Sequence, residues 1–189
     1  ILPILSYGNS ILKKKALPLS INTKNIKTLI NNMWDTMYAA QGVGLAAPQI
    51  GESIRLFIVD TYLFSDNDDL SMDERNFLKG FKKVFINPKI IEENGKECIF
   101  NEGCLSIPGI RENVLRKDSI TIKFQDLNGK FIKESFSGIA ARVIQHEYDH
   151  IEGILFTDKL SFLKKKTIKR KLAEISKGKI KVDYSMKFL

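Results

Sequence analysis

The order of hydrophobic and polar residues changes its period along the chain. Between residues 25 and 40, apolar side chains recur every three or four positions, which predicts an amphipathic helix. Residues 119–125 alternate instead, the Asn128-Gly129 pair predicts a tight turn, and residues 131–136 lead the chain back, so this region predicts a β-hairpin. Further strands are expected at residues 55–59, 83–87, 89–92 and 97–100.

Two more helices are predicted in the second half of the chain. Ser137 is placed to cap a helix over residues 139–152, which Gly153 ends. A final helix is expected over residues 161–176, whereas the acidic residues of 65–74 predict an exposed loop. Because several strands precede one well-capped helix, the fold class is α+β with a largely antiparallel sheet.

Composition is typical of a globular protein. Of the 189 residues, 43% are hydrophobic and 28% are charged, which excludes a wholly disordered chain. No apolar run approaches the roughly 20 residues of a membrane helix, and the apolar N-terminus is too short for a secretion signal. The two cysteines, Cys98 and Cys104, fit a reducing compartment. We therefore expect a soluble, cytoplasmic protein in which residues 1–189 form one domain.

The positive charge is confined to one part of the chain. The formal net charge is +8, and residues 164–181 hold nine basic side chains and one acidic side chain, so they account for the whole excess. Ile168, Leu172 and Ile175 recur there at helical spacing, which predicts a helix with a narrow buried stripe and a wide lysine face. Any contact with a polyanion is expected on that face.

The strongest chemical signal lies in the helix predicted over residues 139–152. It carries His146-Glu147-Tyr148-Asp149-His150, which includes both histidines of the chain. Positions i and i+4 of a helix differ by about 40° around its axis, so both imidazoles project from one face and suit one metal ion. Glu147 lies close enough to accept a proton from water at that ion without being a ligand.

A tetrahedral catalytic site needs a third protein ligand. Glu152 lies about 120° around the same helix from His146, so it points elsewhere. Cys104 lies in a glycine-containing loop and is poorly placed as core filler, whereas Cys98 has the apolar, alternating surroundings of a small buried residue. A thiolate with two imidazoles suits Fe(II), Zn(II), Co(II) or Ni(II) better than magnesium or calcium.

Three segments together resemble the peptide deformylase family. They are Gly42-Val43-Gly44-Leu45-Ala46-Ala47-Pro48-Gln49, Glu102-Gly103-Cys104-Leu105-Ser106 and Gln145-His146-Glu147-Tyr148-Asp149-His150. The resemblance covers about residues 1–165, and residues 61–80 look longer than the family's shortest members need. It implies strands around a central helix that carries the histidines, followed here by a basic C-terminal helix. It also implies hydrolysis of the N-formyl group from the first methionine of new polypeptides, with release of formate.

The resemblance assigns roles to individual residues. The implied metal ligands are Cys104, His146 and His150. Glu147 is implied as the general base and then the general acid, and the Gln49 amide and the Leu105 backbone N–H are implied to face the developing oxyanion. The family implies one divalent metal ion, Fe(II) in the cell, with Zn(II), Ni(II) or Co(II) in a purified sample.

Candidate substrate contacts follow from the same motifs. They are Val43, Gly44, Phe100, Arg111, Ile139, Arg142 and Val143. Gly44 would let an extended peptide pair with the backbone, and the apolar side chains would enclose methionine, the alternative for each of them being an ordinary core position. The stem of Arg142 is expected to line this pocket while its guanidinium reaches water or the substrate backbone, the alternative being a surface salt bridge. Arg111 is the other expected contact for the peptide.

One further contact is predicted behind the metal site. Asp149 lies between the two histidines in sequence, and a carboxylate beside a metal site usually has a cationic or N–H partner. We predict that this partner is Arg116, the alternative being hydrogen bonds from Asp149 to the backbone.

Two other functions share parts of this pattern. A broader metallopeptidase would also carry H-E-x-x-H, and a ribosome- or RNA-binding protein would also carry the basic helix. The neutral body of the chain and the complete catalytic set favour the enzyme. The expected partners are N-formylmethionyl nascent peptides and, through the basic helix, the ribosome; we expect no membrane and no sequence-specific nucleic acid binding.

Overall fold

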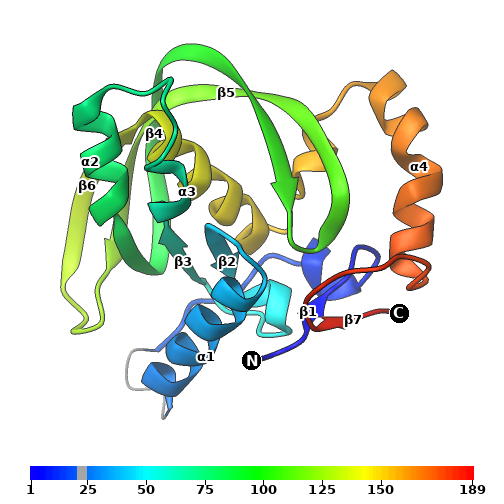
Figure 1. Ribbon diagram of the computed structural model, residues 1–189. Helices are drawn as coiled ribbons and strands as arrows, with labels where there is room; N and C mark the ends of the chain where they lie inside the picture. The colour runs from blue at the N-terminus through cyan, green and yellow to red at the C-terminus, as the bar shows by residue number, and fades with distance from the viewer. Residues whose placement is uncertain (21–24) are drawn as a thin grey trace.

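The computed structural model describes residues 1–20 and 25–189, and an antiparallel sheet forms its centre (Figure 1). The strands of this sheet are β2 (Gly44–Ala46), β3 (Leu56–Asp60), β4 (Lys82–Cys104), β5 (Ile107–Gln125) and β6 (Phe131–Ser137). They lie in the order β2-β3-β4-β5-β6, and every neighbouring pair is antiparallel. Two short strands, β1 (Ile4–Leu5) and β7 (Met186–Lys187), pair with each other in parallel.

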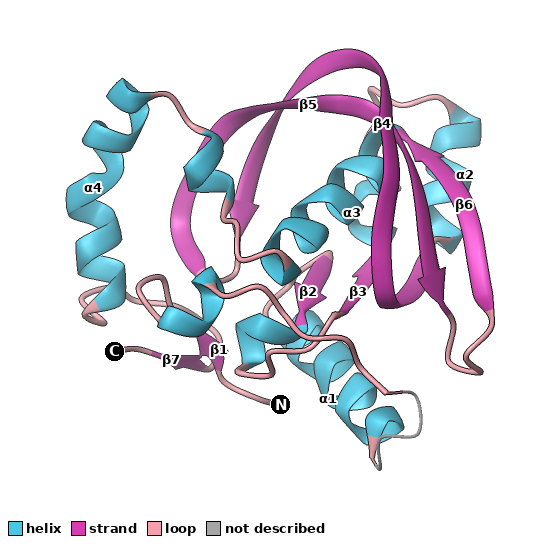
Figure 2. Ribbon diagram, turned by 180° about the vertical axis from the view of Figure 1, so that it is seen from behind, coloured by secondary structure: helices cyan, strands magenta, loops and turns pink. Residues whose placement is uncertain are grey.

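The helix α3 lies at the centre of the fold. The helices are α1 (Ile26–Ala39), α2 (Met72–Gly80), α3 (Gly138–Ile151) and α4 (Phe162–Ser176), and short 3-10 helices cover Ser10–Lys13, Ala47–Ile50, Tyr62–Phe64 and Phe156–Lys159. β4 and β5 arch over α3 (Figure 2). Ala140 and Ile144 of α3 are fully buried in one apolar cluster with Phe57 and Phe85 of the sheet. This arrangement confirms the predicted α+β class.

Most predicted elements are confirmed, but the long strands differ from the prediction. The segments expected between residues 83 and 100 belong to the single strand β4, and β5 begins at Ile107, well before the predicted start. The pairing of β4 with β5 has several register shifts. Each shift exchanges the inward and outward positions of a strand, so the alternating pattern breaks although the strand continues. Ser137 does precede α3, but its side chain makes no capping hydrogen bond.

Residues 65–74 are not simply an exposed loop, because α2 begins within them. Ser71 and Glu74 form a capping box: the Ser71 hydroxyl accepts from the Glu74 N–H at 3.3 Å, and the Glu74 carboxylate accepts from the Ser71 N–H at 3.1 Å. The Ser-x-x-Glu spacing was a helix signal in the sequence, and the acidic composition around it concealed that signal. α2 buries Leu78 in the same cluster as α3.

The helix α4 lies at one side of the molecule against β5 (Figure 1). Its buried residues are Ile168, Leu172 and Ile175, which confirms the predicted stripe. They share an apolar cluster with Ile107 and Ile110 of β5. Within the described parts of the chain, no helix is both long enough and apolar enough to cross a lipid bilayer.

Candidate active site

Three potential metal ligands meet where α3 passes the end of β4. His146 and His150 lie one turn apart on α3, with ring centroids 5.0 Å from each other. Cys104 is the last residue of β4, and its Sγ lies 3.2 Å from His150 Nε2. One ligand atom from each of the three residues lies within 4.8 Å of the other two. A thiol and two imidazoles this close together fit the coordination sphere of a single transition-metal ion.

A buried carboxylate, Glu102, organises the polar groups behind these ligands. It is 4% exposed and accepts a hydrogen bond from His146 Nδ1 at 2.9 Å. Because Nδ1 is engaged, Nε2 of His146 is left for a metal ion. Arg116 donates to both oxygens of the same carboxylate, at 2.7 and 2.9 Å. No role was predicted for Glu102 from the sequence, although it is the first residue of the Glu-Gly-Cys-Leu-Ser motif.

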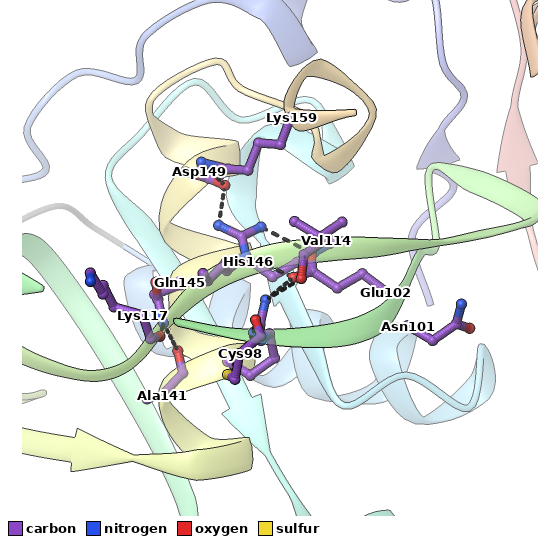
Figure 3. Close-up of polar contacts among 12 residues, drawn as sticks. Cys98, Asn101, Glu102, Val114, Lys117, Ala141, Gln145, His146, Asp149 and Lys159 are labelled. Carbon is purple, nitrogen blue, oxygen red and sulfur yellow. Dashed lines mark hydrogen bonds and ion pairs between the residues drawn. The ribbon is translucent and has the colours of Figure 1, made fainter. Parts of the chain in front are cut away.

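The predicted pair between Asp149 and Arg116 is confirmed. Arg116 Nη1 donates to Asp149 Oδ2 at 2.6 Å, and Lys159 Nζ lies 3.3 Å from the same oxygen. Figure 3 shows Asp149 on α3 between Lys159 and the groups around Glu102. Arg116 therefore joins two carboxylates: Glu102, which contacts His146, and Asp149, which lies between the two histidines in sequence.

Arg142 differs from its prediction, because its guanidinium is buried rather than directed to water or a surface partner. The residue is 4% exposed, and its Nη1 donates to Glu102 Oε1 at 2.9 Å. Nη2 donates to the Cys98 carbonyl at 2.7 Å and lies 3.0 Å from the Cys98 sulfur. Cys98 is half-buried, so it is less enclosed than predicted. Arg142 thus supplies a second cation to Glu102 from within the wall of the site.

Replacing Glu102 is expected to destabilise both the fold and the metal site. Glu102→Gln leaves two buried guanidinium groups without their shared anion, and breaking a buried ion pair in this way costs about 3–5 kcal/mol of unfolding free energy. Loss of the carboxylate charge behind His146 is expected to weaken metal affinity by about 10–100-fold. Urea unfolding and metal titration measure the two effects.

The matched control is Glu97→Gln. Glu97 lies on the same strand with a 59% exposed side chain, and its nearest cation, Lys117, is 4.0 Å away. A surface replacement of this kind should change the unfolding free energy by less than about 0.5 kcal/mol. Equal stability of Glu102→Gln and the wild type would contradict the importance assigned to the buried cluster.

Glu147 lies against the backbone of Gly44 at the floor of the site. It is 4% exposed, and its Oε2 has no hydrogen-bond partner among residues 1–20 and 25–189. A Cβ atom on Gly44 would lie 2.5 Å from Glu147 Oε1, which is too close for any side chain. The glycine therefore makes room for the carboxylate, a reason that the sequence analysis did not foresee. Burial raises the pKa of Glu147 to about 7.

The titration of the other buried groups follows from their neighbours. Burial disfavours the charged form of His150 and, with the positive charges of His146 and Arg116, places its pKa well below the ordinary value. For His146, hydrogen bonds to Cys104 and Glu102 outweigh burial and raise the pKa. Burial also opposes ionisation of Glu102, but Arg116 and His146 lower its pKa. A metal ion bound at His146 would therefore have to displace a proton.

Gln49 lies beside the thiol of Cys104. Its Oε1 accepts from the Ala46 N–H at 2.8 Å, which fixes the orientation of the amide. The NH₂ group then faces the Cys104 sulfur at 3.6 Å and the Ser106 hydroxyl at 3.3 Å. The side chain is 1% exposed, so a donor is held rigidly at the edge of the metal site.

A cavity of about 430 Å³ opens onto these groups. Of the predicted substrate contacts, it is lined by Val43, Gly44, Phe100, Arg111, Arg142 and Val143, together with Gln49, Leu105, Cys104, His146 and Glu147. Ile139 is not among the lining residues and instead packs at the border of the apolar core, so its contact with substrate stays a prediction. The guanidinium of Arg111, which is exposed, donates to Asn101 Oδ1 at 3.0 Å at the rim.

Two lining residues come from segments that the sequence analysis did not connect with the site. Phe64 lies in the 61–80 segment and makes an edge contact with Phe100, with ring centroids 6.2 Å apart. Tyr184 lies near the C-terminal end of the described chain. The extra length of the 61–80 segment is visible in the sequence, but no periodicity or motif around Phe64 or Tyr184 predicts that either residue lines a cavity.

Comparison with known proteins decides the family. The polypeptide deformylase family profile matches residues 1–166. The peptide deformylase of Christiangramia forsetii is 59% identical over 188 residues, covering 100% of this chain and 96% of the relative, and that of Flavobacterium johnsoniae is 54% identical with the same coverage. The chain belongs to the peptide deformylase family. Solved structures agree: a Legionella pneumophila peptide deformylase has a TM-score of 0.79 at 40% identity, covering 95% of this chain and 97% of that one.

The family determines the reaction. Peptide deformylases hydrolyse the N-formyl group of N-formylmethionine on nascent peptides and release formate, and this chain is such a hydrolase. Peptide deformylase 1B of Arabidopsis thaliana, solved with an inhibitor, has a TM-score of 0.80 at 34% identity, with coverage of 94% and 92%. The deformylase is metal-dependent, and its cysteine and two histidines form the group able to hold the ion.

Proposed function

We propose that Cys104, His146 and His150 hold the metal ion of this deformylase and that Glu147 transfers the protons. The convergence of the three donor atoms within 4.8 Å beside a buried carboxylate carries this proposal. When bound, the metal ion supplies Lewis acidity that makes water a nucleophile near neutral pH. Glu147, with a pKa raised to about 7, accepts a proton from the attacking water and later donates it to the leaving amine.

The negative charge that develops on the formyl oxygen needs donors that are already in place. We assign this role to the Gln49 NH₂ group and the Leu105 backbone N–H, which both border the cavity. Ala46 holds the Gln49 amide through Oε1, so little reorganisation is needed when the charge forms. The loss of one such donor typically costs about 10²–10³ in rate.

The substrate is proposed to lie as an extended strand along residues 42–44. Among the strands of the described residues, β2 pairs only with β3, so its other backbone edge is placed to pair with a peptide. Val43, Phe100, Val143 and the stem of Arg142 would enclose the methionine side chain, and Arg111 at the rim would face the peptide backbone. Hydrolysis of formyl-Met-Ala without cleavage of an internal fluorogenic peptide tests this specificity against a broader metallopeptidase.

We propose Fe(II) as the metal ion in the cell. A thiolate with two imidazoles accepts Fe(II), Zn(II), Ni(II) or Co(II), so the donor set alone does not choose among them. Fe(II) is redox-active beside a thiol that oxygen can oxidise. The iron form is therefore expected to lose activity in air while the nickel form retains it. Metal analysis of enzyme purified without oxygen should find iron, and equal half-lives of the two forms in air would oppose the prediction.

We also propose that α4 brings the enzyme to ribosomes in the cytoplasm. Its lysines are exposed, and Lys166 and Lys169 lie on the side away from the buried stripe, which favours salt-sensitive attraction to RNA. This segment and the strand β7 pack on the rest of the chain, which supports one domain over residues 1–189.

Neutralising part of this face is expected to weaken ribosome binding without affecting the hydrolysis of a short formyl peptide. The test variant replaces the exposed Lys166, Lys169 and Lys177 with Gln, and the control replaces Lys123, Lys130 and Lys133 of the β5–β6 hairpin. Co-sedimentation at several salt concentrations should show a shallower salt dependence for the first variant only. Equal binding by the two variants would contradict a role of α4.

A further inference from the structure

The turn between β4 and β5 is bound by both ends of the chain. It consists of Leu105 and Ser106, directly after the ligand Cys104. The backbone N–H of Tyr7 donates to the Ser106 carbonyl at 2.8 Å, and the Tyr184 hydroxyl donates to the Leu105 carbonyl at 2.7 Å. Two consecutive carbonyl groups of the turn are thus bound by segments that are remote from it in sequence.

The two segments that bind the turn are themselves connected. β1 and β7 pair in parallel beside the turn, as Figures 1 and 2 both show, and the Ile4 N–H donates to the Ser185 carbonyl at 2.9 Å. The Leu189 N–H donates to the carbonyl of Ser176, the last residue of α4, at 3.2 Å. Tyr184 therefore lies between Ser176 and Ser185, whose backbone carbonyls both accept hydrogen bonds from remote backbone N–H groups.

We propose that Tyr184 is a positioning residue of the deformylase, which orients the Leu105 N–H by binding the Leu105 carbonyl. Peptide planes are rigid, so the direction of the Leu105 N–H relative to its own carbonyl depends only on two backbone angles of that residue. The Leu105 side chain is also packed: it lies against the apolar core and so close to Gly42 that a Cβ built there would be 2.8 Å from its Cδ1. With carbonyl and side chain both fixed, the N–H has little freedom left.

This inference rests on the proposed role of the Leu105 N–H as an oxyanion donor. A donor of that kind acts mainly in the transition state, so a loosened donor lowers kcat and leaves KM nearly unchanged. A different role for Tyr184 is also testable, since its ring lines the cavity. A residue that only forms the wall would keep kcat when the hydroxyl alone is removed and would raise KM when the ring is removed.

The decisive variant is Tyr184→Phe, which keeps the ring and removes the hydrogen bond. We expect kcat on formyl-Met-Ala, expressed per bound metal ion, to fall by about tenfold, because misplacing a catalytic group by about 1 Å can cost up to 10²-fold. KM should change less than about twofold. Amide hydrogen exchange at Leu105, followed by NMR, should become faster, whereas metal content and melting temperature should stay close to those of the wild type.

Two further variants separate the outcomes. Tyr62→Phe makes the same chemical change at a half-exposed tyrosine outside the cavity lining and should leave all these quantities unchanged. Gln49→Leu removes the other proposed oxyanion donor. If Gln49→Leu loses kcat while Tyr184→Phe keeps it, the inference about Tyr184 is overturned and the proposed mechanism stands. If both variants keep kcat, the oxyanion site itself is misassigned and the inference fails with it.

Discussion

Glu147→Gln is expected to bind its metal ion normally and to lose nearly all turnover. Glutamine has the size of glutamate, so it fills the same space against Gly44. It has no basic oxygen to accept a proton from water, and general acid–base catalysis contributes about 10²–10⁴ to a rate. A loss of this order or larger is expected in kcat on formyl-Met-Ala. Metal content measured on the same sample shows whether the site remains intact.

Glu93→Gln is the control for this change. Glu93 is exposed on β4, so the same replacement there should leave both turnover and metal content unaltered. Turnover of metal-loaded Glu147→Gln within a few-fold of the wild type would remove Glu147 from the mechanism. Loss of metal in this variant would instead show that the carboxylate stabilises the site, and the role of Glu147 in proton transfer would then lack support.

Cys104→Ser is expected to lose the metal ion and, with it, activity. A hydroxyl is a harder and weaker ligand than a thiolate for late transition metals, so affinity should fall by more than about a hundredfold. The neighbouring groups are fixed, with His150 Nε2 only 3.2 Å from the sulfur, and they do not offer a substitute donor of the same kind. Competition with a chelator, followed by elemental analysis, measures the change.

The second cysteine of the chain provides a matched control. Cys98 lies on the same strand, is also half-buried, and accepts a contact from Arg142 that serine can reproduce. Cys98→Ser should keep its metal ion. Equal metal retention by the two variants would exclude Cys104 as a ligand.

Tests of α4 need point variants rather than removal of the C-terminal segment. A truncated chain would lose the basic face, but it would also lose Tyr184 from the cavity and β7 from its pairing with β1. Activity, stability and ribosome binding would then change together. Lysine replacements on the exposed face leave the buried stripe of Ile168, Leu172 and Ile175 in place, so they separate the three effects.

Where a single helix or hairpin carries the residues concerned, the sequence was sufficient to predict how they are arranged. The helical repeat alone places His146 and His150 on one face, and it makes the stripe of α4 recognisable. Alternation and an Asn-Gly turn identify the β5–β6 hairpin without reference to anything else. The three motifs identified the family because their spacing is itself a property of the sequence.

The tertiary structure decided which remote residues meet. Apolar periodicity shows which face of an element is buried, but not which partner covers it. Glu102 of β4 meets Arg116 of β5 and the α3 residues Arg142 and His146 only because these three elements cross there, and this crossing turns Arg142 inward.

Two of the residues that line the cavity likewise could not be predicted from local sequence patterns. Phe64 reaches it because the 61–80 segment folds back over β4, and Tyr184 reaches it because β7 pairs with β1 at the other end of the chain. Such contacts depend on the path of the backbone through space, which no local pattern contains. The sequence by itself therefore determined the reaction and the candidate metal ligands, whereas the tertiary structure determined which groups contact those candidates and which residues line the cavity.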